Sequence, residues 1–207
     1  LVSEVFPPEQ LKSLGKGTIA VGHVRYGTTG SDNKRNVQPI LVNHFKGRMA
    51  LAHNGNLTNS RELRQELESR GSIFQTTTDS EVIAYIIVQE RLNRGSIEEA
   101  VSAAMDRIEG AYSLVLSSPT KLIAVRDPHG FRPLCMGRLK DGAVVFASET
   151  CALDAIGAAF ERDIRPGEIV VADAKTGELR SITDHVGRPD SQMCVFEYIY
   201  FSRPDSI

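Results

Sequence analysis

Short apolar runs and longer amphipathic segments follow one another along the chain and predict strands at both ends with helices between them. Runs of about four to eight residues rich in Val, Ile, Leu and Ala, bounded by Gly, Asn or Pro, are typical of strands. Such runs occupy residues 17–24, 48–53, 111–116, 121–125, 142–147, 168–172 and 197–201. The spacer Ser-Ser-Pro-Thr between the third and fourth runs has the length of a hairpin loop, so these two strands are expected to pair.

Three consecutive segments in the middle of the chain have helical periodicity, and each opens with a residue type that caps helices. Asn59 precedes the first segment, which ends at Gly71. The sequences Thr-Asp-Ser-Glu at residues 78–81 and Ser-Ile-Glu-Glu at residues 96–99 fit the capping box, in which each end residue bonds the backbone N–H of the other. We therefore expect three helices, the last running to Gly110.

The order of these elements predicts an α+β fold. Strands come first, then helices and then strands again, with one further short helix expected near residues 152–156. A doubly wound parallel sheet would instead alternate strands and helices. The length of 207 residues corresponds to one or two domains. The glycine-rich sequence motifs of phosphate-binding loops do not occur, so the sequence gives no support to a nucleotide-cradling loop.

Composition excludes several classes of function. Lys and Arg number 24 against 26 Asp and Glu, a net charge of −2, which is not the electrostatic footprint of a nucleic-acid-binding or membrane-surface protein. The apolar runs are far shorter than the roughly 20 residues that cross a bilayer. Three scattered cysteines are too few for a disulfide framework and favour a reducing compartment. We therefore expect a cytoplasmic protein without nucleic-acid or membrane partners.

Four polar positions lie at the ends of predicted elements, where side chains that bind ligands usually project. Arg25 follows the first strand, and Asp79 lies in the first turn of a helix. Asn54 and Gly55 end the strand at residues 48–53. An arginine can hold both oxygens of a carboxylate and an aspartate can hold an ammonium group, so Arg25 and Asp79 together could bind a free α-amino acid. The Asn54 side-chain amide and the Gly55 backbone N–H form the adjacent donor pair that an oxyanion hole needs.

Each of these residues also has an ordinary structural explanation. Arg25 fits a surface ion pair, and the Asn-Gly pair is the commonest type I′ hairpin turn. The charge of Asp79 fits the N-terminal end of a helix dipole. His23 and His53 flank strands without a second histidine at metal-ligand spacing, so we expect them to be core histidines.

Three short motifs, in this order, resemble the class II glutamine amidotransferase domain of the N-terminal-nucleophile hydrolases. They are Gly-His-Val-Arg-Tyr at residues 22–26, His-Asn-Gly-Asn-Leu at residues 53–57 and Thr-Asp-Ser-Glu at residues 78–81. Later motifs are similar to those of the amidophosphoribosyltransferases, and the last of them is highly specific to that family. They lie at residues 127–134, 148–154 and 197–206. The resemblance covers essentially the whole chain.

The resemblance implies a four-layer αββα sandwich and assigns a role to each candidate residue. Arg25 would hold the α-carboxylate of L-glutamine and Asp79 its α-ammonium group. Asn54 and Gly55 would form the oxyanion hole, and the residues after Arg25 would form the family's glutamine loop. In family members the released ammonia attacks phosphoribosyl pyrophosphate in a second, phosphoribosyltransferase half, which opens purine nucleotide synthesis.

The chain departs from the family pattern at the nucleophile, which in the family is an N-terminal cysteine. The first cysteine of this chain is Cys135 and the chain begins with Leu1, so we expect a portion of a glutaminase domain that is inactive alone. Other class II amidotransferases, such as hexosamine-6-phosphate synthase, glutamate synthase and asparagine synthetase, share the Arg, Asn-Gly and Asp pattern. The ending at residues 197–206 is not expected from them. A non-catalytic binding domain on the same scaffold is the remaining alternative.

The resemblance also implies a domain division, cofactors and partners. Residues 1–194 would form the glutaminase domain, and residues 195–207 the junction to a phosphoribosyltransferase domain, which would bind Mg²⁺ and phosphoribosyl pyrophosphate in an intact homo-oligomeric enzyme. Cys194 matches a ligand of the 4Fe–4S cluster found in some members. A cluster needs about four thiolates, so its other ligands would lie elsewhere, and a buried thiol is an equal alternative. Cys135 and Cys151 are expected to be core cysteines.

Overall fold

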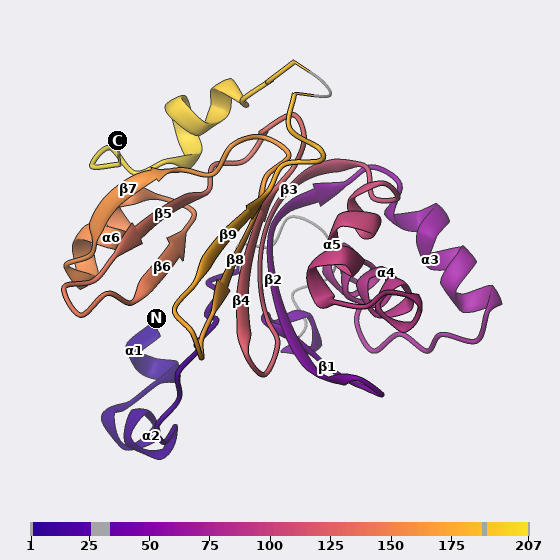
Figure 1. Cartoon of the computed structure of the whole chain (residues 1–207), viewed down its shortest axis with the longest axis horizontal. Coiled ribbons are helices and arrows are strands. Elements are labelled where there is room, and N and C mark those ends of the chain that lie inside the picture. Colours follow the sequence, from indigo (N-terminus) through magenta and orange to yellow (C-terminus); the bar gives the residue numbers. More distant parts are fainter. Residues whose placement is uncertain (1, 26–33, 188–189, 207) are drawn as a thin grey trace.

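Two antiparallel sheets form the centre of the molecule (Figure 1). The computed structural model describes residues 2–25, 34–187 and 190–206. The larger sheet has six strands in the order β1-β2-β3-β4-β8-β9, and the smaller sheet has three in the order β6-β5-β7. The strands are β1 (Ile40–His44), β2 (Gly47–Leu57), β3 (Gly110–Ser117), β4 (Lys121–Arg126), β5 (Cys135–Arg138), β6 (Val144–Ala147), β7 (Ala159–Asp163), β8 (Ile169–Asp173) and β9 (Leu179–Ile182).

Helices cover the outer faces of both sheets and complete a four-layer arrangement (Figure 1). The larger sheet is covered by α3 (Ser60–Ser69), α4 (Asp79–Asn93) and α5 (Ile97–Met105), and the smaller sheet by α6 (Thr150–Ile156). Two short helices, α1 (Val2–Val5) and α2 (Pro8–Ser13), and a single helical turn, η1 (Lys34–Asn36), precede β1. The predicted α+β fold and αββα sandwich are confirmed.

Three apolar cores separate the four layers, because the strands of the larger sheet are apolar on both faces. In β4, Ile123 and Val125 belong to the core beneath α3, α4 and α5, whereas Ala124 belongs to the core between the two sheets. This alternation follows from the two-residue period of a strand. A third, small core joins the smaller sheet to α6 through Cys135 and Leu153. Strands buried on both faces therefore read as continuous apolar runs in the sequence.

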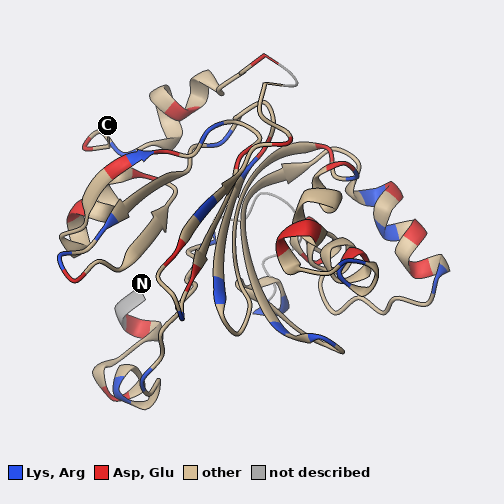
Figure 2. Ribbon diagram, in the orientation of Figure 1, with Lys and Arg blue, Asp and Glu red and all other residues tan. Residues whose placement is uncertain are grey.

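The helices differ in how much of their surface is buried. Figure 2 shows acidic and basic residues alternating along α3, and the helix buries only Leu63 and Leu67 against the core. The first half of α4 is buried almost completely, because this helix lies between α3, α5 and the larger sheet. Its polar N-terminal residues are consequently held in a desolvated environment beside the sheet. Among the described helices, none is both long and apolar enough to cross a membrane.

Two of the predicted strands are wrong. Residues 17–24 are irregular and pair with no strand of the described chain, although their β-branched composition suits a strand. Residues 197–201 form a single helical turn, η2 (Glu197–Phe201), whose Tyr198 and Tyr200 are about three-quarters exposed. A strand needs a neighbouring strand to satisfy its backbone groups, and composition alone does not supply one.

Four strands were not predicted, and three of them lie at sheet edges. β1, β7 and β9 are edge strands with many exposed positions, so they lack the continuous apolar run that marks the central strands. β5 is central but only four residues long. The predicted hairpin is confirmed, because β3 and β4 pair with Ser117 opposite Leu122.

The helix ends correct two of the predicted caps. Ser96 accepts a hydrogen bond from the Glu99 N–H at 3.2 Å, as predicted, but α5 ends at Met105 rather than at Gly110. Thr78 makes no side-chain cap of α4. The Asn59 side chain likewise does not cap α3, because it bonds the backbone of Arg107 and Glu109 instead.

Candidate functional site

Asn54 and Gly55 lie inside a strand and not at its end. β2 continues to Leu57, with Asn54 opposite Ser113 and Gly55 opposite Tyr112 of β3. The interpretation that the strand ends at residue 53 is therefore wrong, and so is the alternative of a type I′ hairpin turn. Both residues are held in a ladder between two long strands, which fixes their backbone more tightly than a turn would.

Gly55 is required at its position by its backbone conformation and by its closeness to β3. Its φ is +144°, a value that residues with a side chain rarely adopt. A Cβ atom built on Gly55 would lie 2.0 Å from the carbonyl oxygen of Ala111. The absence of a side chain thus allows β3 to approach β2 closely beside Asn54.

Asp79 is fixed against the same part of β2. It is the first residue of α4 and is only 6% exposed. Its Oδ2 accepts a hydrogen bond from the Leu57 N–H at 2.9 Å, and its Oδ1 lies 3.7 Å from Nδ1 of His53. Burial alone would raise the pKa of Asp79, but the interactions with His53 and with the Leu57 N–H outweigh it and hold the pKa below its ordinary value. Asp79 is therefore a buried carboxylate that stays ionised at neutral pH.

His53 links Asp79 to the residues that precede Arg25. It is 3% exposed, and its Nδ1 lies 3.2 Å from Oγ of Ser80. Its Nε2 is buried without a hydrogen-bond partner among the described residues. Burial, the charge of His53 and the charge of Arg25 together lower the pKa of His23, so His53 and Arg25 are both near that ring. The prediction that His53 is a core histidine is confirmed in its burial, although one ring nitrogen is left unsatisfied.

Asn54 and His23 also line a cavity of about 340 Å³. Strands of both sheets contribute to its wall, including Ser113 of β3 and Phe146 of β6. Arg25 and Asp79 do not line it. The candidate site is thus divided: Asn54 faces the cavity and Asp79 packs against β2 from α4. Arg25 is half-buried, and its charge contributes to the lowered pKa of His23, which lines the cavity. The predicted glutamine loop falls on residues 26–33, which lie outside the described residues.

None of the three cysteines lines the cavity. Cys135 is buried in β5, and burial raises the pKa of its thiol to about 11. Cys151 is half-buried in α6, so the prediction of a core cysteine is confirmed for Cys135 and wrong for Cys151. Cys194 is half-buried, and its N–H donates a hydrogen bond to the Phe131 carbonyl. Within residues 2–25, 34–187 and 190–206, no group of three or more His, Cys, Asp or Glu side chains could hold a metal ion.

Sequence reasoning missed two residues that contact the site's backbone. Asn36 bonds Thr77, two residues before Asp79, and Gln38 bonds the backbone of His53, next to Asn54. Asn36 ends the helical turn η1 and Gln38 lies just before β1, where neither periodicity nor a known motif distinguishes a buried amide from a solvated one. The sequence therefore carried no signal that could have found them.

Comparison with known proteins places the chain in a family. The profile of the glutamine amidotransferase domain matches residues 23–155. Amidophosphoribosyltransferase 2 of Arabidopsis thaliana is 48% identical over all 207 residues, which correspond to 36% of that protein. Amidophosphoribosyltransferase of Methanocaldococcus jannaschii is 44% identical over the whole of this chain and 46% of its own length.

Solved structures give the same result. Glutamine phosphoribosylpyrophosphate amidotransferase from B. subtilis, in complex with ADP and GMP, superposes with a TM-score of 0.80 and is 40% identical, over 89% of this chain and 39% of that chain. A structure described as the allosteric regulatory enzyme of purine biosynthesis superposes with a TM-score of 0.87 at 38% identity, over all of this chain and 43% of that one. The chain thus spans less than half the length of these relatives. The αββα sandwich is of the N-terminal-nucleophile hydrolase type, and the chain belongs to the glutamine amidotransferase family.

Proposed function

We propose that this protein releases ammonia from L-glutamine and transfers it to phosphoribosyl pyrophosphate, which gives phosphoribosylamine in the first step of purine nucleotide synthesis. The relatives that match the whole chain carry the name of that activity. The observation that carries the proposal is the buried, ionised carboxylate of Asp79, which accepts a hydrogen bond from Leu57 of β2, two residues after Gly55. Buried charges in proteins are paired or hydrogen-bonded, and a bound ammonium group would add a cationic partner beside His53 and the Leu57 N–H.

A glutamine molecule lying across β2 would meet complementary groups on both sides of the strand. Its α-ammonium group would bind Asp79 on the side of α4, and its α-carboxylate would be held by Arg25 through two parallel hydrogen bonds. Its side-chain amide would then lie toward Asn54 and the cavity between the sheets. The division of the site between two faces of β2 thereby fits a substrate with a zwitterionic end and a neutral amide end.

The chemical step would place negative charge beside Asn54 and Gly55. Attack on the glutamine amide converts the carbonyl oxygen into an oxyanion, and the Asn54 side chain and the Gly55 N–H would donate to it. None of the thiols in the described residues lines the cavity, and Cys135 has a raised pKa that disfavours the nucleophilic thiolate. The cysteine nucleophile of the family is accordingly not assigned to any residue of this chain.

The remaining parts of the reaction would belong to a further half of the enzyme, since the chain spans less than half the length of its relatives. Phosphoribosyl pyrophosphate and Mg²⁺ would bind in that phosphoribosyltransferase half. Cys194 could supply one thiolate of a 4Fe–4S cluster but cannot form its ligand set, because the other two cysteines lie in β5 and α6. This ligand role, the domain boundary at residue 194, a homo-oligomeric enzyme and a cytoplasmic location stay predictions.

Substitutions at the three polar positions test the proposal in the full-length enzyme. We expect Asp79→Asn and Arg25→Ala to raise the KM for glutamine about tenfold to 100-fold, because each removes a charge-assisted hydrogen bond. We expect Asn54→Ala to lower kcat of the glutamine-dependent reaction by about 10²–10³ with a smaller change in KM, because its donor acts on developing charge. Steady-state kinetics with glutamine and with free ammonia as nitrogen donor would measure both effects.

A surface aspartate provides the matched control. Asp173 lies at the end of β8, and among the described residues its Oδ1 accepts hydrogen bonds from the N–H groups of Lys175 and Thr176 in its own turn, so Asp173→Asn should leave both reactions unchanged. Ammonia-dependent synthesis should survive in all four variants. Equal losses of glutamine-dependent and ammonia-dependent activity in Asp79→Asn would contradict the proposed binding role.

A further inference from the structure

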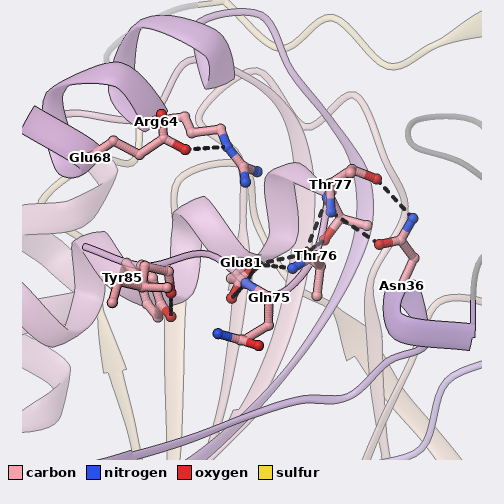
Figure 3. Close-up of polar contacts among 10 residues, drawn as sticks. Asn36, Arg64, Glu68, Gln75, Thr76, Thr77, Glu81 and Tyr85 are labelled. Atoms are coloured by element: carbon pink, nitrogen blue, oxygen red, sulfur yellow. Dashed lines mark hydrogen bonds and ion pairs between the residues drawn. The ribbon is translucent and has the colours of Figure 1, made fainter. Parts of the chain in front are cut away.

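Two side-chain amides, those of Asn36 and Gln38, each form a pair of hydrogen bonds beside the candidate site. Asn36 is 1% exposed; its Nδ2 donates to Oγ1 of Thr77 at 2.9 Å, and its Oδ1 accepts from the Thr77 N–H at 3.1 Å (Figure 3). Gln38 accepts from the His53 N–H at 2.6 Å and donates to the His53 carbonyl at 3.3 Å. A side-chain amide offers a donor and an acceptor side by side, and both Asn36 and Gln38 use the two groups on a single partner residue.

The amide of Gln38 takes the place of a missing strand residue at the edge of β2. β1 pairs with β2 in a register that puts Leu41 opposite Ala50 and Ile40 opposite Leu51. Continuing that register would put residue 38 opposite His53, but the strand begins only at Ile40. The Gln38 side chain supplies the donor and acceptor that its backbone would otherwise present. The backbone directly before Asn54 is thereby held on both of its edges, by Gln38 on one and by β3 on the other.

Asn36 bonds a turn that is itself rigidly held. Glu81, 3% exposed in α4, accepts hydrogen bonds from the Gln75 N–H at 2.9 Å and from the N–H and Oγ1 of Thr76, both at 2.7 Å (Figure 3). The capping box predicted for residues 78–81 is therefore wrong, because Glu81 holds residues 75 and 76 instead of Thr78. Thr77 follows directly and is held from the other side by Asn36. The turn that leads into Asp79 is thus hydrogen-bonded at three successive residues by the side chains of Glu81 and Asn36.

We propose that Asn36 and Gln38 are positioning residues that together fix the separation between Asp79 and Asn54. The two amides belong to residues separated by Val37 alone, and they bond two parts of the chain that come from different elements, the turn before α4 and strand β2. Val37 between them is 60% exposed, so its side chain takes no part in this bridge. The inference rests on the proposed function, since it assigns the amides a role in placing the groups that would bind the two ends of glutamine.

The test compares three variants of the full-length enzyme with two control variants. We expect Asn36→Ala and Gln38→Ala each to lower kcat/KM for glutamine by about tenfold to 100-fold, because sub-ångström to 1 Å displacements of binding groups have effects of this size. Gln38→Glu keeps the acceptor but turns a carboxylate oxygen toward the His53 carbonyl, so it should cause the same loss with little change in side-chain volume. Ammonia-dependent synthesis should stay at the wild-type rate.

Val37→Ala and Asn59→Ala are the controls. Val37 belongs to the same segment, and Asn59 forms an equivalent pair of hydrogen bonds, with the Arg107 carbonyl and the Glu109 N–H, away from Thr77 and His53. Hydrogen–deuterium exchange should show faster exchange of the His53 amide in Gln38→Ala, which loses its acceptor, and of the Thr77 amide in Asn36→Ala, and of neither amide in the controls.

The outcomes separate the inference from the proposed function. A wild-type kcat/KM in the Asn36 and Gln38 variants, despite faster amide exchange, would overturn the inference alone. A loss of kcat/KM in Asn59→Ala as large as that in Asn36→Ala would overturn it too, because general destabilisation would then explain both. A wild-type enzyme without glutamine-dependent activity would overturn the proposed function itself, and the positioning role with it.

Discussion

At the scale of single residues, a buried carboxylate can have a purely structural role or belong to a binding site. Asp127 is completely buried, and it accepts hydrogen bonds from the backbone N–H groups of Tyr112, His129 and Phe131. Burial raises its pKa, and these N–H groups oppose that rise. The motif at residues 127–134, which supports the family resemblance, therefore begins with a residue that holds a turn against β3 and has no part in the candidate site. Asp79 differs because its partners include a histidine ring as well as a single backbone N–H.

Gly55 gives a sharp prediction at this scale. We expect Gly55→Ala to lower the free energy of unfolding by roughly 3–5 kcal/mol, because the new Cβ would overlap the Ala111 carbonyl and force β2 and β3 apart. Gly71→Ala is the matched control: its φ is also positive, at +90°, but a Cβ there would meet nothing within 4 Å. The control should lose only about 1–2 kcal/mol for the left-handed conformation. Urea unfolding of both variants would measure the difference, and equal losses would refute the steric explanation.

At the scale of elements, buried carboxylates join the layers of the sandwich. Glu168, directly before β8, is fully buried and bonds both Nη atoms of Arg162 on β7, at 2.8 and 2.9 Å, together with Oγ of Ser181 on β9. It therefore ties the smaller sheet to the larger one. Glu98 likewise joins the helical layer to the larger sheet. It lies in the first turn of α5, and its carboxylate accepts hydrogen bonds from the Lys121 ammonium group of β4.

Removing the charge of Glu168 should loosen the contact between the two sheets. We expect Glu168→Gln to reduce the free energy of unfolding by about 2–4 kcal/mol, because Arg162 loses its carboxylate partner and the buried amide cannot accept every donor around it. Glu161→Gln is the control: Glu161 lies on β7 next to Arg162, and its ion pair with Arg138 joins two side chains that are about one-third exposed. Its loss should lower the free energy of unfolding by at most about 1 kcal/mol. Thermal unfolding would compare them; an equally small effect of Glu168→Gln would show that the sheets do not depend on this pair.

The elements that could be predicted from the sequence are those whose own residues decide their structure. Central strands such as β3 and β4 are apolar runs, and the Ser96 cap depends on a side chain three residues from its partner. Edge strands and the segment at residues 17–24 depend on where a neighbouring strand lies, which local sequence does not contain. The capping box at residues 78–81 is absent for a related reason: the Glu81 carboxylate accepts hydrogen bonds from the N–H groups of residues 75 and 76, and the Thr78 hydroxyl pairs with that of Thr76.

At the scale of the whole molecule, the candidate site depends on segments that are far apart in the chain. The sequence suggested Arg25, Asn54, Gly55 and Asp79 by their chemistry. In the structure Asn54 lies in β2, and Asp79 is hydrogen-bonded to Leu57 of the same strand. The sequence did not suggest that Asn36 and Gln38 bridge them, because hydrogen bonds from the short stretch at residues 36–38 to two separate elements leave no periodic signal. The roles of the four predicted residues in catalysis and binding stay predictions.

The stability of the sandwich should depend on pH through the carboxylates that connect its layers. Burial alone would raise the pKa of Glu98 and Glu168, but the hydrogen bonds from Lys121 to Glu98 and from Arg162 to Glu168 hold both pKa values below the ordinary value of about 4.3. The unfolded chain therefore binds more protons than the folded one as the pH falls past that value. By linkage, the stabilisation from both groups is complete above about pH 5 and is lost as the pH falls through the folded-state pKa values.

We accordingly expect these carboxylates to leave the urea midpoint unchanged between about pH 6 and pH 7 and to lower it between about pH 5 and pH 3. His23, whose pKa is lowered in the folded chain, should add a smaller fall of the midpoint as the pH drops below about 7. The double variant Glu98→Gln, Glu168→Gln should begin with a lower midpoint at pH 7 and show a smaller fall, because two of the groups responsible no longer titrate. Asp79 has a depressed pKa and should account for part of the fall that remains, whereas Asp127, with its raised pKa, acts in the opposite direction. Chemical unfolding at a series of pH values would measure both curves. Parallel curves for the wild type and the double variant would mean that the layers are not held together by these ionised groups, and the acid sensitivity would then have to arise elsewhere in the fold.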